Sequence, residues 1–447
     1  MSNVLTNQSA QMWEQFVSSL ATNAGGKGLS VSTYMPTSGL SAADWEYLDT
    51  TGIGTGTPGE IIPPNIITWA DSMPEWGASY VPGNSFYDQY KAFLYSIKLK
   101  GGDPAQQQIA TALGVKVTNA QQDLSDTRSA MISAWTKFNG EQSALPPSAQ
   151  QSYTEWYNAN YAGTISAKEN ALQAAEANYN AALQKVGGPD YQTLSNAIGK
   201  VTLSSGAGNA LKDTAGVLYP MYKITGDLNS WFLSALQNDG KNPEVNFTID
   251  LSQSKTYNGA KSSYFNTSVS GGYSSFFWGG EASFAYQQSK SATDYSNLVE
   301  KLSMTYTAQS MQMFTATPGN WYDSAIISAF YDQIDPNSAF ANKDLFGEKG
   351  LLNLETRQIL VVFRPEVTLS GTKDQISEVT NTFHQASQSS FSIGGFFWSA
   401  SASVNQGQDS YNATVETSND GKSVTFKYNS NTPKVIGIVP QNLNPQA

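Results

Sequence analysis

The sequence predicts an α+β protein in two parts. A mainly helical domain is expected over residues 1–240, with a long antiparallel helical hairpin at about 115–186, and a β-rich domain is expected over 241–447. Two observations carry this prediction. Apolar residues change from the three-and-four spacing of helices to the alternation of strands near the boundary. The β-rich part then contains two similar units, at about 244–320 and 360–440.

The helical part rests on four segments. Apolar residues recur at helical spacing over 5–23 and 85–100, and alternate spacings of three and four over 115–138 and 148–186. The last two segments carry a heptad seam, and the short connection between them places the two helices antiparallel. The predicted seam residues are Val117, Ala120, Leu124, Thr127, Met131, Ala134 and Phe138 in the first segment, and Tyr161, Ile165, Lys168, Leu172, Ala175, Tyr179, Ala182 and Val186 in the second. The hairpin has two interpretations: a scaffold or oligomerisation arm, or a weakly packed pair that opens to present an amphipathic face to lipid or to a neighbour.

Turn and cap residues set the limits of these elements. Asp103 and Pro104 favour a helix start, because Asp caps and Pro fits the first turn. The run 187–189, Gly-Gly-Pro, ends the hairpin, and the turn formers of 238–243 mark the domain boundary.

An aromatic triplet occurs in both β units, and the two triplets lie 120 residues apart. The triplets are Phe276-Phe277-Trp278 and Phe396-Phe397-Trp398. Each follows a Gly-Gly pair, which favours a hairpin turn, directly in the second copy and after a three-residue insertion in the first. After the second triplet, apolar residues alternate with Ser399, Ser401 and Ser403, as in a half-buried strand. The apolar face of that strand is formed by Phe396, Trp398, Ala400, Ala402 and Val404.

The flanks of the two triplets also match. A strand is expected before each triplet, at 247–251 and 366–369, and another after it, at 302–306 and 424–428. A helix is expected over 372–386, in the second unit. Between the units, a helix at 321–331 and a buried strand at 358–363 are expected.

The triplets have two interpretations. They form a core layer of a β-sandwich, with Trp398 mostly buried. Alternatively, the weakly hydrophobic strands that follow them rest in a soluble protein and convert to a membrane barrel. Such a strand needs about 9–11 residues, and the segment from Phe396 to Val404 meets the lower limit.

The composition excludes several classes of function. With a formal net charge of −11, the chain lacks the basic surface that binds nucleic acid or anionic lipid. It has no Cys, so disulfides, thiolate metal sites and cysteine nucleophiles are absent. No Sec signal peptide is expected at Met1–Leu5, and no apolar run reaches the roughly 18 residues of a transmembrane helix. The sequence leaves a cytoplasmic location and release by a non-Sec route both open.

No catalytic, cofactor or metal site is predicted. His384 is the only histidine and is expected on the solvated face of a short helix. The Gly-rich run 52–59 lacks the strand and the Lys-Ser/Thr pair of a nucleotide-binding loop. An oxygen-rich loop at 332–344 could suit Ca²⁺, but turn and cap chemistry explains it more simply. Paired carboxylates need no local motif, so the sequence leaves that kind of catalysis open.

These observations favour a non-enzymatic, oligomerising, membrane-active protein. Its general plan resembles that of pore-forming toxins, a likeness at the level of the fold. The expected partners are further copies of the chain and a membrane or cell-surface receptor. The alternative is a self-assembling structural or surface-binding protein without membrane insertion, suggested by low charge, neutral polar residues and duplication.

Overall fold

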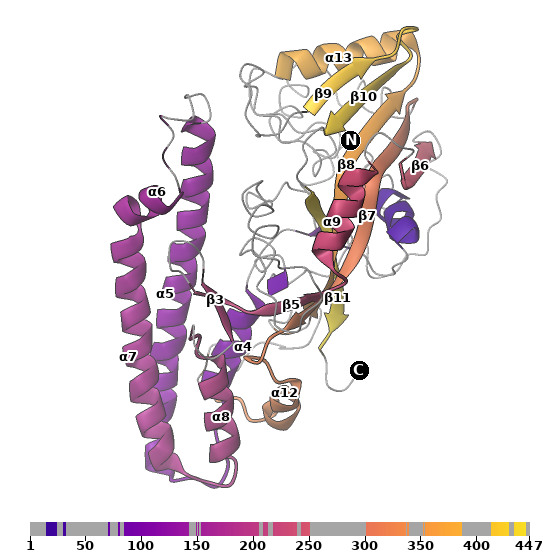
Figure 1. Cartoon of the computed structure of the whole chain (residues 1–447). Coiled ribbons are helices and arrows are strands. Elements are labelled where there is room, and N and C mark those ends of the chain that lie inside the picture. Colours follow the sequence, from indigo (N-terminus) through magenta and orange to yellow (C-terminus); the bar gives the residue numbers. More distant parts are fainter. Residues whose placement is uncertain are drawn as a thin grey trace, which may run out of the picture.

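The computed structural model describes residues 15–24, 30–32, 70–71, 79–80, 85–142, 149, 151, 153–204, 209–212, 218–238, 243–250, 301–336, 338, 352, 354–386, 413–428 and 433–443. Helices and a largely antiparallel sheet together confirm the α+β class. Figure 1 shows a group of long helices standing beside the sheet, joined to it by short elements at one end.

Two long helices, α5 (Pro104–Gln142) and α7 (Ala162–Val186), pack along each other. They run in opposite directions, because the Asp103 amide donates to the Val186 carbonyl at 3.0 Å while Arg128 pairs with Glu169 at 2.9 Å. Buried side chains recur every seven residues along both helices, as a heptad seam requires. They are Ala110, Val117, Leu124 and Met131 on α5, and Ile165, Leu172, Tyr179 and Val186 on α7.

The expectation of one helix over 148–186 is wrong. α6 (Tyr153–Asn160) ends one residue before α7 begins, and Tyr161 between them leaves helical geometry at φ −129° and ψ −22°. Tyr161 packs against Trp156 with ring centroids 5.3 Å apart, and the Asn160 amide donates to the Trp156 carbonyl at 2.8 Å. Backbone hydrogen bonds still pass through this point, from the Tyr161 amide to the Tyr157 carbonyl at 2.9 Å and from the Ile165 amide to the Tyr161 carbonyl at 2.8 Å. The buried seam of α7 starts at Ile165.

Side-chain caps place the helix starts. A helix begins at Pro104, as expected, and the Asp103 carboxylate accepts from the Ala105 amide at 2.8 Å. This helix is α5 itself, so the long helix expected over 115–138 is longer at both ends. α13 (Lys373–Ala386), within the helix expected at 372–386, begins with a capping box between Thr372 and Gln375. The other helices are 15–24, α4 (Phe86–Tyr95), α8 (Tyr191–Val201), α9 (Leu228–Gln237) and α12 (Ser324–Phe330).

The sheet is built on two long antiparallel strands, β7 (Ser303–Pro318) and β8 (Leu354–Ser370). The first half of β7 also pairs with β6 (Val245–Asp250), and its end pairs with β5 (Tyr222–Thr225). The other strands are β1 (Ser30–Ser32), β2 (Ser79–Tyr80), β9 (Ala413–Thr417), β10 (Ser423–Tyr428) and β11 (Lys434–Asn442), with β3 (Ala210–Lys212) and β4 (Leu218–Pro220) in a separate pair.

The early part of the chain contributes to this sheet. β1, β2 and β5 all precede residue 241, and they extend the sheet through β11 and β7. The sheet therefore takes strands from both sides of residue 240, and the main hydrophobic cluster joins residues of the helices to residues of β7, β8 and β11.

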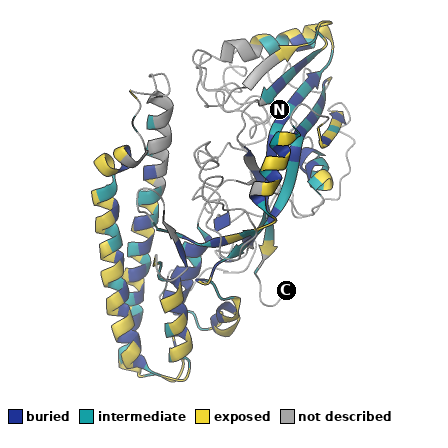
Figure 2. Ribbon diagram, viewed as in Figure 1, coloured by how far each residue is buried: buried dark blue, intermediate teal, exposed yellow. Residues whose placement is uncertain are grey.

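β8 changes character at Arg364, whose φ of 46° is left-handed, and at Pro365. Before this point residues 359–363 are all buried, as expected for a fully covered strand. After it, burial alternates along β8, as it does along β10 and along β7 over residues 303–310. Figure 2 shows the long strands largely buried and the outer faces of the helices exposed.

The buried face at this end of the sheet is covered by the helix 15–24. Phe16 on that helix packs against Phe247 at 5.8 Å and against Tyr306 at 5.6 Å between ring centroids. The apolar side of the four strands β6, β7, β8 and β10 is therefore buried, and their other side carries polar residues, among them a row of threonines, Glu366 and Lys427.

Candidate functional site: four strands and the connections they support

Two strand pairs have equivalent registers. In the pair β6–β7, Thr248 lies opposite Thr305, and in the pair β8–β10, Thr368 lies opposite Thr425. Both partners of the second pair lie 120 residues after their counterparts in the first, the same shift that separates the aromatic triplets. Neighbouring positions follow the same rule along both pairs.

The threonines make the same contact in each pair. Their hydroxyls are 2.8 Å apart in the first pair and 2.9 Å apart in the second. β7 pairs with β8 with Thr305 opposite Thr368, so all four threonines lie in one row across the strands. The alternation of apolar and polar residues in the sequence already matches these strands to one another. The four threonines are a further match at the same 120-residue shift.

The four strands end together. Asp250, Ser303, Ser370 and Ser423 lie opposite one another in the row where β6 ends, β7 begins, β8 ends and β10 begins. The two connections, 251–302 and 371–422, are therefore equal in length and leave the same end of the sheet from neighbouring strand pairs.

The candidate residues of the sequence lie in these connections. The two triplets occupy the same position in each, because they share the 120-residue shift of the strands. Outside the described residues lie Phe276, Phe277, Trp278, Phe396, Phe397, Trp398, Ala400, Ala402 and Val404. The expected burial of Trp398 therefore stays a prediction.

Part of the second connection is described. It begins with α13, whose Ile376 and Val379 are buried, in agreement with the amphipathic pattern of the sequence. It ends with β9, which turns back to pair with β10 along their lengths. An ion pair between Lys427 on β10 and Glu416 on β9, 2.7 Å long, adds to this pairing.

A second cluster joins the helices to the sheet around Trp321. This side chain is fully buried and lies within 5.3–6.1 Å, between ring centroids, of four aromatic side chains on α4 and β5. They are Phe86, Tyr87, Tyr90 and Tyr222. The indole N–H donates to the Met221 carbonyl at 2.7 Å. The cluster thus fixes α4 against the sheet.

Asp71 lies buried at the same junction. Its carboxylate accepts from the Tyr87 amide at 2.8 Å and from the Tyr222 hydroxyl at 2.7 Å, and lies 2.5 Å from the Ser85 hydroxyl. Burial raises the pKa of Asp71 to about 7, and the nearby Asp88 adds to the rise. Burial also raises the pKa of Glu355 to about 7. Such long-range contacts leave no signal in the sequence.

We expect acidification to stabilise the protein through Asp71. Its pKa is raised in the fold from 3.8 to about 7, so the folded state binds more protons than the unfolded state between these values. This contribution to stability is fully present below the unfolded pKa and is lost as the pH rises through the folded pKa. Thermal melting from about pH 5 to pH 8 measures the slope. Asp71→Asn should make it shallower, leaving the parts due to Glu355 and Asp88, whose pKa values are also raised, and an unchanged slope would contradict this assignment.

A buried ion pair links α4 to α7. Lys91 Nζ lies 2.5 Å from Glu176 Oε1, and the two side chains are 5% and 8% exposed. The ammonium also lies 5.7 Å from the centre of the Tyr87 ring. Close by lies Asp88, which is half-buried; desolvation raises its pKa, while Arg128 opposes the rise. Charged groups thus lie between α4 and the long helices.

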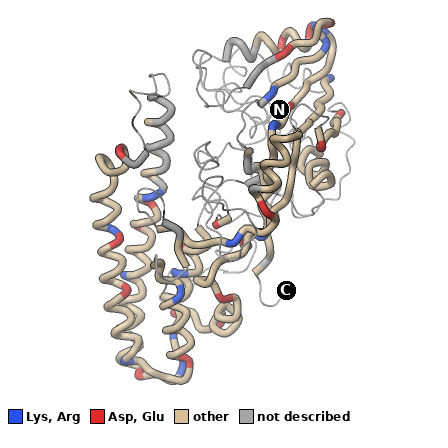
Figure 3. The backbone as a smooth tube through the Cα atoms, in the orientation of Figure 1, with Lys and Arg blue, Asp and Glu red and all other residues tan. Residues whose placement is uncertain are grey.

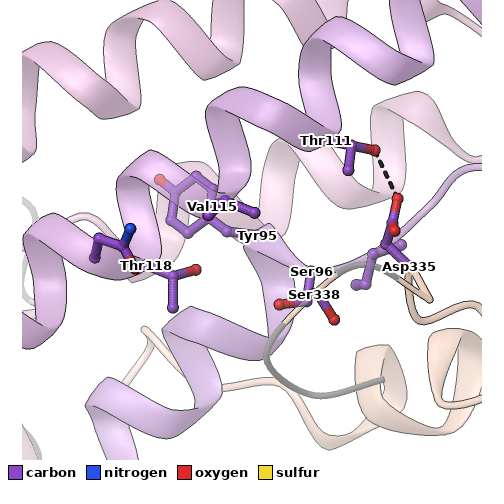
Figure 4. Close-up of a pocket in the computed structure, with 9 residues that line it drawn as sticks. Tyr95, Ser96, Thr111, Val115, Thr118, Asp335 and Ser338 are labelled. Carbon is purple, nitrogen blue, oxygen red and sulfur yellow. Dashed lines mark hydrogen bonds between the residues drawn. The ribbon is translucent and has the colours of Figure 1, made fainter. Parts of the chain in front are cut away.

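The oxygen-rich loop is tied to the helices by Asp335 and Asp332. Asp335 is buried and accepts from the Thr111 hydroxyl at 2.7 Å, beside a pocket of about 30 Å³ (Figure 4). That volume suits about one water molecule. Asp332 pairs with Lys100 at 3.2 Å. In the part of the chain that the structure describes, no group of three or more His, Cys, Asp or Glu is placed to hold a metal ion.

Other expectations fall partly outside the described residues. His384 lies in α13, but its side chain is outside the described residues. The Gly-rich run 52–59 and two residues of the oxygen-rich loop, Asn337 and Asp344, also lie outside them. Among the helices that the structure describes, none combines the length and apolar character needed to span a bilayer. Figure 3 shows the charged residues of the described parts scattered along the chain rather than gathered by sign.

Comparison of the chain with protein-family models, with curated proteins and with solved structures found no match.

Proposed function

We propose that this is a non-enzymatic, oligomerising, membrane-active protein of the pore-forming type. In this proposal the connections 251–302 and 371–422 each extend as a β-hairpin and enter the membrane. The second connection must first give up α13 and the pairing of β9 with β10. The residues that would meet lipid lie on one face of the strand after each aromatic triplet. They are Gly280, Ala282, Phe284 and Tyr286 after the first triplet, and Ala400, Ala402 and Val404 after the second.

One observation carries the proposal. The two connections leave neighbouring strand pairs at the same end of one sheet, in equivalent registers. Strands that extend from these ends would continue the existing hydrogen-bond ladders, so each copy would supply four adjacent strands. A membrane barrel needs such continuous pairing, because unpaired backbone groups are costly in lipid.

The residue pattern of the connections supports the same reading. After Trp398, small apolar residues alternate with serine through Val404. A barrel strand needs one face for lipid and one for the lumen, and this alternation supplies both. The small size of the apolar residues fits a segment that rests against a soluble protein before it inserts.

The helical pair has the role of a scaffold or oligomerisation arm in this proposal. Its seam contains buried Gln107 and Gln121 beside the apolar residues. The ion pair between Lys91 and Glu176 holds α4 to α7. Inserting this unit would bring the buried Lys91 and Glu176 into lipid, where charged side chains are costly, which favours the strands over the helices as the inserting element.

Dye release tests the proposal. The protein is added to vesicles of phosphatidylcholine, of phosphatidylcholine with cholesterol, and of phosphatidylcholine with glycolipid, each loaded with a fluorescent dye. Release that grows with protein concentration is expected, and protein unfolded beforehand serves as the control. Intact vesicles of all three compositions would contradict the proposal.

A self-assembling protein without membrane insertion is the second candidate. It is favoured by the low charged fraction, 14%, and by β6, which pairs with β7 on one side and with no described strand on the other. Electron microscopy of the same samples separates the two. Rings or filaments without dye release would favour this candidate, whereas rings seated in leaking vesicles would favour a pore.

A further inference from the structure

We infer that the sheet edge at β10 is the binding site for β6 of a second copy of the chain, in the register that β8 shows against β7. This inference rests on the proposed assembly and names its interface. It requires β9 to leave the edge of β10, so β9 acts as a guard strand in the single copy.

The two edges are complementary in the order of the sheet. The four strands lie in the order β6, β7, β8, β10. β6 has no described strand on its outer side. On the outer side of β10 the one described strand is β9. β9 is five residues long and lies at the end of the strand order. A short edge strand is a common way to block edge-to-edge association.

The equivalent registers supply the template. Under the 120-residue shift, β10 corresponds to β7, and β8 corresponds to β6. The contact between β7 and β8 inside one chain is therefore the contact expected between β10 and β6 of the next chain. Thr305 lies opposite Thr368 in the template, which places Thr425 opposite Thr248 of the second copy.

The side chains at this junction match by type. The buried Val424 would lie opposite the buried Ile249 of the second copy, and Phe426 opposite Phe247. The threonine row would continue through Thr425 to Thr248. Pairs of apolar or β-branched side chains directly opposite each other stabilise antiparallel strands.

The charges at the junction are compatible too. Lys427, released from Glu416, would face Asn246 of the second copy, and Ser423 would face Asp250. No like charges meet. The two surfaces differ, so the contact is head-to-tail and repeats from copy to copy, giving a ring if the rotation closes and a filament if it does not.

Paired cysteines test this contact, since the chain has no cysteine of its own. The double variant Thr248→Cys/Thr425→Cys is oxidised with and without phosphatidylcholine–cholesterol vesicles and run on a non-reducing gel. Within one chain these positions are three strand spacings apart, about 14 Å, beyond the Cα separation of roughly 7 Å that a disulfide tolerates. Disulfides can therefore form only between copies, and loss of the monomer band to a ladder of multimers is expected.

Two further variants control the result. Thr305→Cys/Thr425→Cys keeps the cysteine at the edge strand β10 but places the second cysteine on β7, which has a strand on each side. This variant should run as a monomer on the non-reducing gel. Glu416→Cys/Thr425→Cys links β9 to β10 at a directly opposed pair. The linked protein should lose assembly, and reduction should restore it.

The outcomes separate the interface from the proposed function. If vesicles release dye but the Thr248→Cys/Thr425→Cys variant forms no ladder of linked multimers, the interface is wrong and the pore-forming proposal stands. The ladder without dye release would support the interface and overturn membrane insertion. Equal ladders from both double variants, or assembly by the linked β9–β10 protein, would also overturn the interface. Absence of both ladder and dye release would overturn both. Melting points near that of the unmodified protein show that each variant folds.

Discussion

Trp321→Ala is expected to lower the free energy of unfolding by about 3–5 kcal/mol, the usual loss for a fully buried large aromatic. The truncation removes ring contacts with α4 and β5 and leaves the Met221 carbonyl without the indole donor. A domain has only about 5–15 kcal/mol of net stability, so the thermal midpoint should fall sharply.

Ile109→Ala is the control for this change. Ile109 is 49% exposed on α5, and substitutions at such surface positions usually change stability by less than about 0.5 kcal/mol. Similar melting points for Trp321→Ala and the unmodified protein would mean that this cluster does not hold the helices to the sheet.

Lys91→Met is expected to cost about 3–5 kcal/mol, because it leaves Glu176 buried without its partner. The double variant Lys91→Met/Glu176→Leu should recover most of this loss, since two apolar side chains then fill the same space. Denaturant unfolding of the single and double variants measures both effects.

The exposed pair between Lys100 and Asp332 provides the comparison. Its side chains are 65% and 55% exposed, and exposed pairs contribute about 0–1 kcal/mol. Lys100→Met should therefore change little. If Lys91→Met behaves like Lys100→Met, the buried pair is not a stabilising link between α4 and α7.

Local chemistry made much of the fold predictable. Asp103 and Pro104 mark the start of α5, and Thr372 with Gln375 the start of α13, because capping depends on residues next to one another in sequence. Heptad spacing likewise identified the buried Val117, Leu124 and Met131 on α5, and the buried Ile165, Leu172, Tyr179 and Val186 on α7. Strand alternation located β6, the start of β7 and β10.

Contacts between distant residues were not predictable. The break at Tyr161, where φ is −129°, was not marked by the heptad spacing, which continues through this residue. In the seam, sequence spacing selected Lys168 and Ala175, but the buried charged residue is Glu176, paired with Lys91 from another helix. Asp71 is buried through contacts with Tyr222 and Ser85, and neither is its neighbour in sequence.

The candidate site was likewise predictable from the sequence only in part. The 120-residue shift of the aromatic triplets was visible in the sequence, and the strand registers on either side of the connections carry the same shift. That the two strand pairs adjoin, so that the connections emerge side by side, depends on the pairing of β7 with β8. No sequence pattern specifies which strands become neighbours across such separations.

Dye release by Ser401→Asp and Ala402→Asp tests the central claim most directly. In a barrel strand the two neighbouring residues face opposite ways, one to the lumen and one to lipid. Ser401→Asp should leave release close to that of the unmodified protein. Ala402→Asp should abolish it, because a charge on the lipid face is costly, while its melting point stays near that of Ser401→Asp. Equal release from both variants, with both folded, would contradict insertion of this strand.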